Sequence, residues 1–225
     1  DLHPQHLQMA SKIPLARGLG SSSTAIVAGL VLANELTGAT RSSAELLEVA
    51  TQLEGHPDNV APALLGGLVV ATNTDERVRA VKLPLPTLFA SVYVPNEPLL
   101  TVASRQALPT ELTYHQAITG SSVANTLVAA LATQNWDVAL PLLEQDQFHE
   151  QYRAKLVPAL QTVRDQAHAL GLTGTYLSGA GPTVITLGDY GQLATLQAQL
   201  SQDATLTGQL FLLPMDSTGV KVQKS

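Results

Sequence analysis

The sequence is organised around one glycine-serine stretch, residues 14–23, which reads PLARGLGSSS. It lies between an alternating segment, residues 7–13, which predicts a strand, and an apolar helical pattern over residues 22–36. Glycines let a backbone turn its N–H groups toward an anion, and the helix that follows adds the positive end of its dipole. The stretch therefore predicts a phosphate-binding loop, and the alternative is a tight strand-to-helix turn with ordinary serine caps.

The loop matches neither of the two common nucleotide-binding motifs. A Walker P-loop needs Lys followed by Ser or Thr after its second glycine, and Ser21 stands there instead. A dinucleotide fingerprint needs a third glycine at a spacing that this stretch lacks. A second glycine-rich stretch, residues 177–183, reads LSGAGPT and predicts at least a hairpin turn between two strands.

Outward from the loop, helical and strand patterns alternate and predict a layered mixed fold. Ser42 and Glu45 form the capping box of a second helix, which Gly55 ends. Residues 56–59 predict a turn, residues 68–72 a strand, and residues 73–86 a polar, Pro-punctuated domain boundary. The second half predicts strands at 88–94, 174–177, 183–187 and 209–214, and helices at 117–132, 137–147, 152–169 and 191–200.

The composition is that of a globular protein: 45% of the 225 residues are hydrophobic and 13% are charged. A net charge of −6 disfavours a nucleic-acid surface or an anionic membrane as partner. With no cysteine there is neither a disulfide framework nor a Cys-based zinc site. No apolar run approaches membrane length, and the first residues lack the features of a signal peptide, so we expect a cytoplasmic protein with no membrane partner.

Both glycine-rich stretches resemble motifs of the GHMP kinase superfamily, which phosphorylates small alcohols. Residues 14–22 resemble its phosphate-binding motif, and residues 177–183 its C-terminal glycine motif. The resemblance implies an α+β, two-domain GHMP kinase fold. Residues 1–80 would form an incomplete N-terminal nucleotide-binding domain, and residues 81–225 a C-terminal ferredoxin-like α/β sandwich. Because the superfamily's first acceptor-binding motif is not found and the chain does not begin with Met, we expect that segment to lie upstream and the chain alone to be inactive.

Three further stretches resemble the homoserine kinase family: residues 54–62, EGHPDNVAP; residues 101–109; and residues 146–153, DQFHEQYR. The implied reaction converts ATP and L-homoserine to ADP and O-phospho-L-homoserine, a step toward threonine. A homodimer is left open. Two alternatives remain, namely another GHMP kinase, such as one acting on an isoprenoid alcohol, and a non-catalytic nucleotide-binding protein.

The resemblance implies a set of ATP-binding residues and a magnesium site. The C-terminal glycine motif, with Ser178, Gly179 and Gly181, would support the loop. Magnesium prefers hard oxygen ligands, which Ser22 and Glu54 offer; Glu48 is the competing carboxylate. The residues assigned to ATP are Pro14, Leu15, Ala16, Arg17, Gly18, Leu19, Gly20, Ser21, Ser22, Ser23 and Thr24.

The acceptor site would take two arginines and the segment that begins at His56. Arg105 and Arg153 suit the homoserine carboxylate, because guanidinium binds carboxylate in a planar, two-point fashion; the alternative for each is a solvated residue or a surface ion pair. His56 and Asn59 would bind substrate and serve catalysis. The side chains of Asp58 and Asn59 should diverge, so at most one faces the acceptor hydroxyl. If Asn59 does, no strong base is present and the proton leaves late, to the transferred phosphate.

Overall fold

The computed structural model describes residues 6–74 and 77–223, which fall into two compact units. The first unit contains the chain up to Pro14, Gly20–Leu85 and the C-terminal segment from Asp216. The second contains Leu15–Leu19 and Pro86–Met215. The glycine-serine loop is therefore divided between the units. The assignment of residues 1–80 to the family's N-terminal domain and of residues 81–225 to its C-terminal domain stays a prediction.

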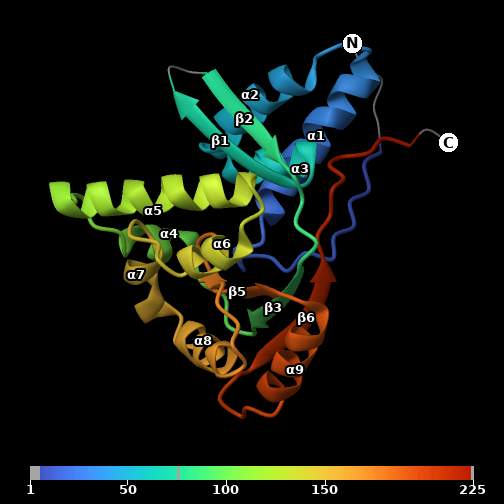
Figure 1. Cartoon of the computed structure of the whole chain (residues 1–225). Helices are drawn as coiled ribbons and strands as arrows, with labels where there is room; N and C mark the ends of the chain where they lie inside the picture. The colour runs from blue at the N-terminus through green and yellow to red at the C-terminus, as the bar shows by residue number, and fades with distance from the viewer. Residues whose placement is uncertain (1–5, 75–76, 224–225) are drawn as a thin grey trace. The chain divides into compact units, whose positions relative to one another are not determined.

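Two helices of the first unit contact an antiparallel strand pair, and a third helix packs against both of them (Figure 1). Their apolar residues, including Val27 of the first helix and Val60 of the third, form one buried cluster. Alternate residues of the strands, such as Val69 and Ala71, pack against that cluster, as expected of a pair with one covered face. The elements are α1 (Ser21–Thr37), α2 (Ser43–Glu54), α3 (Pro57–Leu65), β1 (Leu68–Thr74) and β2 (Arg77–Leu83).

The predicted capping box is confirmed, but the turn predicted at residues 56–59 is wrong beyond its first residue. The Ser42 side chain accepts from the backbone N–H of Glu45, and the Glu45 carboxylate accepts from the Ser42 N–H. His56 is extended, and Pro57 is already the first residue of α3. Proline suits this position because its fixed φ is helical and the N–H that it lacks would be unpaired there anyway.

The strand predicted at the first unit's periphery is wrong. Residues 7–13 form no strand; Leu7 and Met9 are exposed, and the segment pairs with no strand of the described chain. The boundary predicted at residues 73–86 is confirmed, because the units divide between Leu85 and Pro86, but the strand β2 within that stretch was not predicted. Its charged residues conceal the strand pattern because they occupy the exposed face, while Val78 and Ala80 alternate toward the core.

The C-terminal segment returns to the first unit and closes over the end of α3. The backbone N–H of Gly67 donates to the carbonyl of Asp216 at 3.1 Å, and that of Val220 donates to Leu64 at 3.3 Å. Gly66 is buried with φ +71°, and a Cβ there would overlap the backbone of Thr218 and Gly219. The contact therefore requires glycine both for its backbone angle and for space.

The second unit is built on a four-stranded antiparallel sheet in the order β4-β5-β3-β6. Along the chain, β3 is followed by helices, then by β4 and β5, then by one helix and β6. This is the ferredoxin-like arrangement that the resemblance to the GHMP kinases implies, and it is confirmed. The strands are β3 (Phe89–Pro95), β4 (Thr175–Leu177), β5 (Val184–Gly188) and β6 (Gly208–Pro214), and the helices are α4 (Thr101–Gln106), α5 (Tyr114–Ala132), α6 (Trp136–Leu143), α7 (Glu150–Arg153), the 3₁₀ turn η1 (Ala154–Leu156), α8 (Ala159–Ala169) and α9 (Tyr190–Leu200).

The helices α8 and α9 supply the second unit's core, and both contact the sheet (Figure 1). Leu160 and Val163 of α8 and Leu193 and Leu196 of α9 are almost fully buried in one cluster with Val184 of β5. The hydroxyls of Thr175 and Thr186, both fully buried, are 3.0 Å apart. Because these polar groups are paired, they remain compatible with a buried face.

The long helix predicted over residues 152–169 is wrong. Arg153 ends α7, a 3₁₀ turn follows, and α8 begins only at Ala159, after Pro158. Proline cannot donate the backbone hydrogen bond that would continue the helix across this point. The helix predicted over residues 137–147 likewise ends at Leu143, and the short helix α4 was not predicted.

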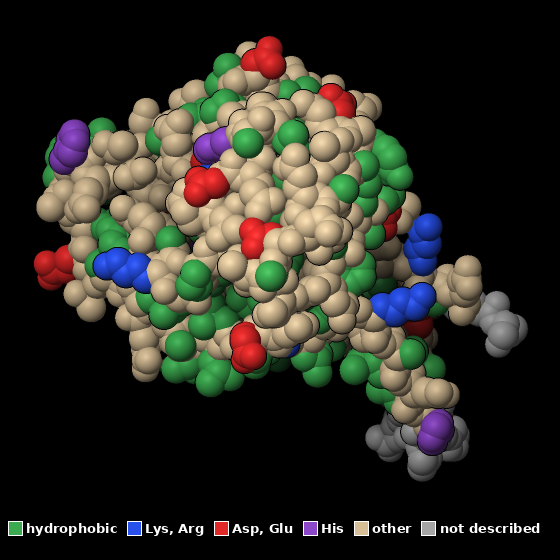
Figure 2. Space-filling view, turned by 90° about the horizontal axis from the view of Figure 1, so that it is seen from below, with side chains coloured by type: hydrophobic (Ala, Val, Ile, Leu, Met, Phe, Trp, Pro, Cys, Tyr) green, Lys and Arg blue, Asp and Glu red, His purple; other side chains and the backbone are tan. Residues whose placement is uncertain are grey.

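The surface carries few charged residues. On the face shown in Figure 2, Lys, Arg, Asp and Glu side chains stand apart among apolar and uncharged groups. Within residues 6–74 and 77–223, no helix is both long enough and apolar enough to span a bilayer.

We predict that Gly66→Ala destabilises the first unit. The added methyl group meets backbone and forces a positive φ on alanine, which together should cost about 2 kcal/mol or more. The control is Gly29→Ala in the exposed interior of α1, where a Cβ meets nothing within 4 Å. It should leave stability unchanged or raise it by up to ~1 kcal/mol. Thermal denaturation of both variants tests this, and equal melting temperatures would contradict it.

Candidate functional site

The loop segment Leu15–Leu19 rests on the hairpin between β4 and β5, residues 177–183, which we call the glycine hairpin. The Ser178 hydroxyl donates to the carbonyl of Gly18 at 2.8 Å, and the Thr183 N–H donates to the carbonyl of Arg17 at 3.3 Å. Within the hairpin, the Gly181 N–H donates to the Ser178 carbonyl at 2.8 Å. Residues 17 and 18 of the first glycine-rich stretch are thus bonded to the second stretch, 160 residues away in the sequence.

Only glycine fits at position 18. Its φ is +73°, and a Cβ would overlap the carbonyl oxygen of Ser178 and lie 2.8 and 2.9 Å from backbone atoms of Gly181. Both obstacles are backbone, so no side-chain rotation could relieve them. The close approach of these two backbones explains why glycine stands at Gly18.

Arg17 anchors the loop to the end of β3. Its Nε donates to the carbonyl of Pro95 at 3.0 Å, and its Nη2 donates to Asn96 at 2.6 Å. The Arg17 guanidinium thus donates to backbone carbonyl oxygens of its own unit. Its neighbours Leu15 and Ala16 are exposed.

In the first unit, Gly20 is the N-cap of α1 and offers no side chain to the helix start. This differs from α2, whose first N–H groups are satisfied by a capping box. The first turn of α1 consists of serines and carries no acidic residue. Its uncapped N–H groups and dipole therefore favour an anion at this end.

The three residues Ser22, Ser23 and Glu54 meet beside the start of α1. The Ser22 hydroxyl donates to Glu54 Oε2 at 3.1 Å, and the Ser23 hydroxyl donates to Oε1 at 3.0 Å. Glu48, the competing carboxylate, instead lines a separate pocket of about 310 Å³ between α2 and the β1–β2 pair. The structure brings together the pair Ser22 and Glu54, and leaves Glu48 apart from it.

The predicted divergence of Asp58 and Asn59 is wrong. The Asn59 amide donates to Asp58 Oδ2 at 3.1 Å, and His56 Nδ1 contacts Asp58 Oδ1. All three residues lie at the start of α3, where neighbouring side chains can converge on one carboxylate. Asn59 also approaches the loop, since its Oδ1 would lie 3.2 Å from a Cβ on Gly20.

In the second unit, Arg153 is fixed by two backbone carbonyls. Its Nε donates to Ser104 at 3.3 Å, and its Nη1 donates to Gly179 at 3.0 Å. Within the described chain, its Nη2 makes no hydrogen bond and its charge forms no ion pair. Burial lowers the pKa of Arg153, the charge of Asp146 opposes this, and the charge of nearby Arg105 adds to it.

Arg105 lies on the helix that also touches the glycine hairpin. Its neighbour on α4, the fully buried Ser104, donates through its hydroxyl to the Ala180 carbonyl at 2.7 Å. Arg105 itself is exposed. The glycine hairpin therefore contacts the loop, Arg153 and the helix that carries Arg105.

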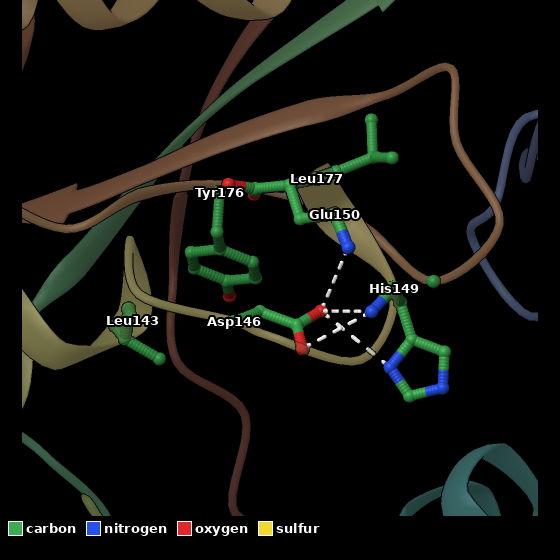
Figure 3. A pocket seen from close by; sticks show the side chains of 7 residues that line it. Leu143, Asp146, His149, Glu150, Tyr176 and Leu177 are labelled. Carbon is green, nitrogen blue, oxygen red and sulfur yellow. Dashed lines mark hydrogen bonds and ion pairs between the residues drawn. The ribbon is translucent and has the colours of Figure 1, made fainter. Parts of the chain in front are cut away.

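A pocket of about 180 Å³ in the second unit is lined by residues that include Asp146, Tyr176 and Gly179 (Figure 3). Its Asp146 carboxylate accepts from backbone N–H groups at the start of α7, including Glu150 at 2.9 Å. Burial raises the pKa of Asp146, but these hydrogen bonds and one from the His149 side chain outweigh it, so the pKa lies well below its usual range. Burial raises the pKa of Tyr176, which also lines the pocket, to about 12. We therefore assign Asp146 the role of a helix cap.

Sequence reasoning missed Ser104, which bonds the glycine hairpin, and Glu144 and Arg164, which bond the strand β4 before it. Only Ser104 lay in a stretch that had been singled out, and its adjacency to Arg105 was the available signal. Among the described residues, no group of three or more His, Cys, Asp or Glu could hold a metal ion. The pair Ser22 and Glu54 falls below that number.

The GHMP kinase family models match both halves of the chain, the N-terminal domain over residues 2–67 and the C-terminal domain over residues 127–204. A homoserine kinase from Lactiplantibacillus plantarum is 96% identical over all 225 residues, which span 77% of that relative. One from Lactococcus lactis subsp. cremoris is 49% identical, over 98% of this chain and 74% of the relative.

Solved structures agree with the sequence relatives. The crystal structure of a homoserine kinase from Cytophaga hutchinsonii is 30% identical and superposes with a TM-score of 0.81, over 93% of this chain and 69% of that one. These similarities confirm the predicted family and its α+β, two-domain fold. The chain belongs to the homoserine kinases of the GHMP kinase family.

Proposed function

We propose that this protein transfers the γ-phosphoryl group of ATP to the hydroxyl of L-homoserine, releasing ADP and O-phospho-L-homoserine. The observation that carries the proposal is Arg153: two backbone carbonyls orient its guanidinium, and one Nη remains without a partner among the described residues. A fixed, half-buried guanidinium with no ion pair suits a ligand carboxylate. Homoserine offers that carboxylate together with a primary alcohol.

The nucleotide phosphates would bind at the start of α1. The uncapped N–H groups behind Gly20 supply donors that a phosphate can accept from without side-chain rearrangement. The serines of the first turn add hydroxyl donors. Phosphoryl transfer depends mainly on positioning and charge neutralisation, which a rigid backbone cradle provides.

Ser22 and Glu54 would hold Mg²⁺. Their oxygens already lie 3.1 Å apart, and a hydroxyl with one carboxylate is a fitting protein contribution for an ion that keeps several waters and binds phosphate. When bound, the ion neutralises charge on the transferring phosphoryl group. Ser23, buried beside them, holds the Glu54 carboxylate toward Ser22 through its own hydrogen bond.

His56 and Asn59 would orient the acceptor hydroxyl. The Asn59 amide N–H₂ faces Asp58, and an amide takes no proton at neutral pH. Asp58 accepts from Asn59 and contacts His56, so both its oxygens are engaged. We infer that the acceptor proton leaves late, to the transferred phosphate, and that Asp58 is the alternative base. A cytoplasmic location and a homodimer stay predictions.

The proposal is tested by ADP release from the full-length protein with a panel of alcohols. L-Homoserine should be the best acceptor, and an isoprenoid alcohol should be poor. Arg153→Ala should lose a charge-assisted hydrogen bond of ~1.5–3 kcal/mol, which is roughly a 10- to 150-fold loss in kcat/KM for homoserine. The loss should fall mainly on KM, because the carboxylate is remote from the reacting oxygen.

Two controls separate carboxylate binding from other roles of Arg153. Homoserine amide should be a poor acceptor for the parent enzyme but suffer little further from Arg153→Ala. Arg153→Lys should recover only part of the loss, since ammonium lacks the two-point fork. An equal loss for homoserine and its amide would remove Arg153 from the carboxylate site.

We predict that Ser22→Ala lowers kcat by ~10²-fold or more, the scale for losing one fixed electrostatic contact of the transition state. The apparent magnesium requirement should rise with it, because only the Glu54 carboxylate would remain of the pair. The comparison is Ser21→Ala in the same helical turn, which should affect ATP binding but leave the magnesium requirement unchanged, because no contact between Ser21 and Glu54 is seen. An unchanged rate at saturating Mg²⁺ and ATP would exclude Ser22 from the site.

A further inference from the structure

The short helix α7 meets the glycine hairpin at two points. The backbone N–H of Leu177 donates to Glu150 Oε2 at 2.8 Å, and Arg153 Nη1 donates to the Gly179 carbonyl at 3.0 Å. Glu150 and Arg153 are three residues apart in the helix, so they project from the same face. One side chain thus fixes the stem of the hairpin and the other touches its turn.

Both carboxylate oxygens of Glu150 are engaged. Oε1 accepts from Arg164 Nη2 at 2.7 Å, and Arg164 Nη2 also donates to the Thr175 carbonyl at 2.6 Å. The Glu150 side chain is only 9% exposed. A buried carboxylate with fixed donors on both oxygens has one defined orientation, and it therefore also fixes the position of the helix that carries it.

These bonds occupy backbone groups of an edge strand. The strand β4 ends the sheet and pairs only with β5 among the described strands. Its Thr175 and Leu177 backbone groups are taken by side chains of Arg164 and Glu150 instead of a further strand. An edge strand bonded in this way is held in register at the point where the glycine hairpin begins.

We propose that Glu150 is a positioning residue that sets the orientation of Arg153 toward the acceptor carboxylate. The expected effect of Glu150 on KM for homoserine rests on the proposed function. Glu150 acts through α7 and the glycine hairpin. Its carboxylate holds the hairpin so that the Gly179 carbonyl accepts from Arg153 Nη1. Arg153 Nη2 is then left to bind the acceptor carboxylate. Without that carboxylate, α7 loses one of its two attachments to the hairpin.

The chain offers a matched control in Glu144. Its Oε1 accepts from the backbone N–H groups of Gly174 and Thr175 at 2.7 and 2.8 Å, and its Oε2 lies 3.7 Å from Arg164 Nε. Its side chain is 12% exposed, close to the value for Glu150. Glu144 therefore holds the same strand and faces the same arginine, but at the end remote from the glycine hairpin.

The kinetic test compares Glu150→Gln with Glu144→Gln. Both should lower the melting temperature. Only Glu150→Gln should raise KM for homoserine, by about 3- to 12-fold, the equivalent of one orienting hydrogen bond, while KM for ATP changes less than about twofold. In an Arg153→Ala background, Glu150→Gln should have almost no further effect on homoserine, because it acts through that arginine. Glu150→Asp should give an intermediate KM and serves if the glutamine variant does not fold.

A second measurement needs no substrate. The exchange rate of the Arg153 Nε–H with water, followed by NMR and assigned with Arg153→Lys, should rise at least about threefold in Glu150→Gln and stay unchanged in Glu144→Gln. If the parent protein does not phosphorylate homoserine but this exchange responds, the proposed function fails and the positioning role stands. The positioning role is overturned if the exchange rate is unaffected, if Glu144→Gln raises KM equally, or if the effects of Glu150→Gln and Arg153→Ala are additive.

Discussion

The structure depends on one close contact, that between the backbone of Gly18 and the glycine hairpin. No side chain separates the two segments at this point, and the Ser178 hydroxyl closes the contact through the Gly18 carbonyl. Gly20, two residues further along the chain, is the N-cap of α1, the helix start proposed to bind phosphate.

The same hairpin also organises the proposed acceptor-binding arginine. Arg153 donates to its Gly179 carbonyl, and the buried Ser104 hydroxyl attaches α4 to Ala180. Backbone carbonyls hold the guanidinium without neutralising it, and burial lowers its pKa. A charge in this state gains free energy when a carboxylate pairs with it, which is the physical basis for placing the substrate carboxylate there.

Local signals in the sequence were sufficient for much of the fold and part of the site. The capping box at Ser42 and the glycine pattern around Gly18 depend on residues a few positions apart, so their roles can be predicted from short stretches. The strand β2 could not be predicted in this way, because its exposed face carries the charges. The bonds of Glu150 to Arg164 and Leu177 join residues 14 and 27 positions apart, and no pattern along the chain indicates them.

The role of the contact between Gly18 and the glycine hairpin is tested by the affinity of Gly18→Ala for ADP, measured by calorimetry against Gly191→Ala. Gly191 lies at the start of α9, where a Cβ meets nothing within 4 Å. Gly18→Ala should weaken ADP binding about 10-fold or more, because the added methyl group forces the loop off the hairpin. Gly191→Ala should bind as the parent does. A Gly18→Ala protein that binds ADP within about twofold of the parent would contradict the account.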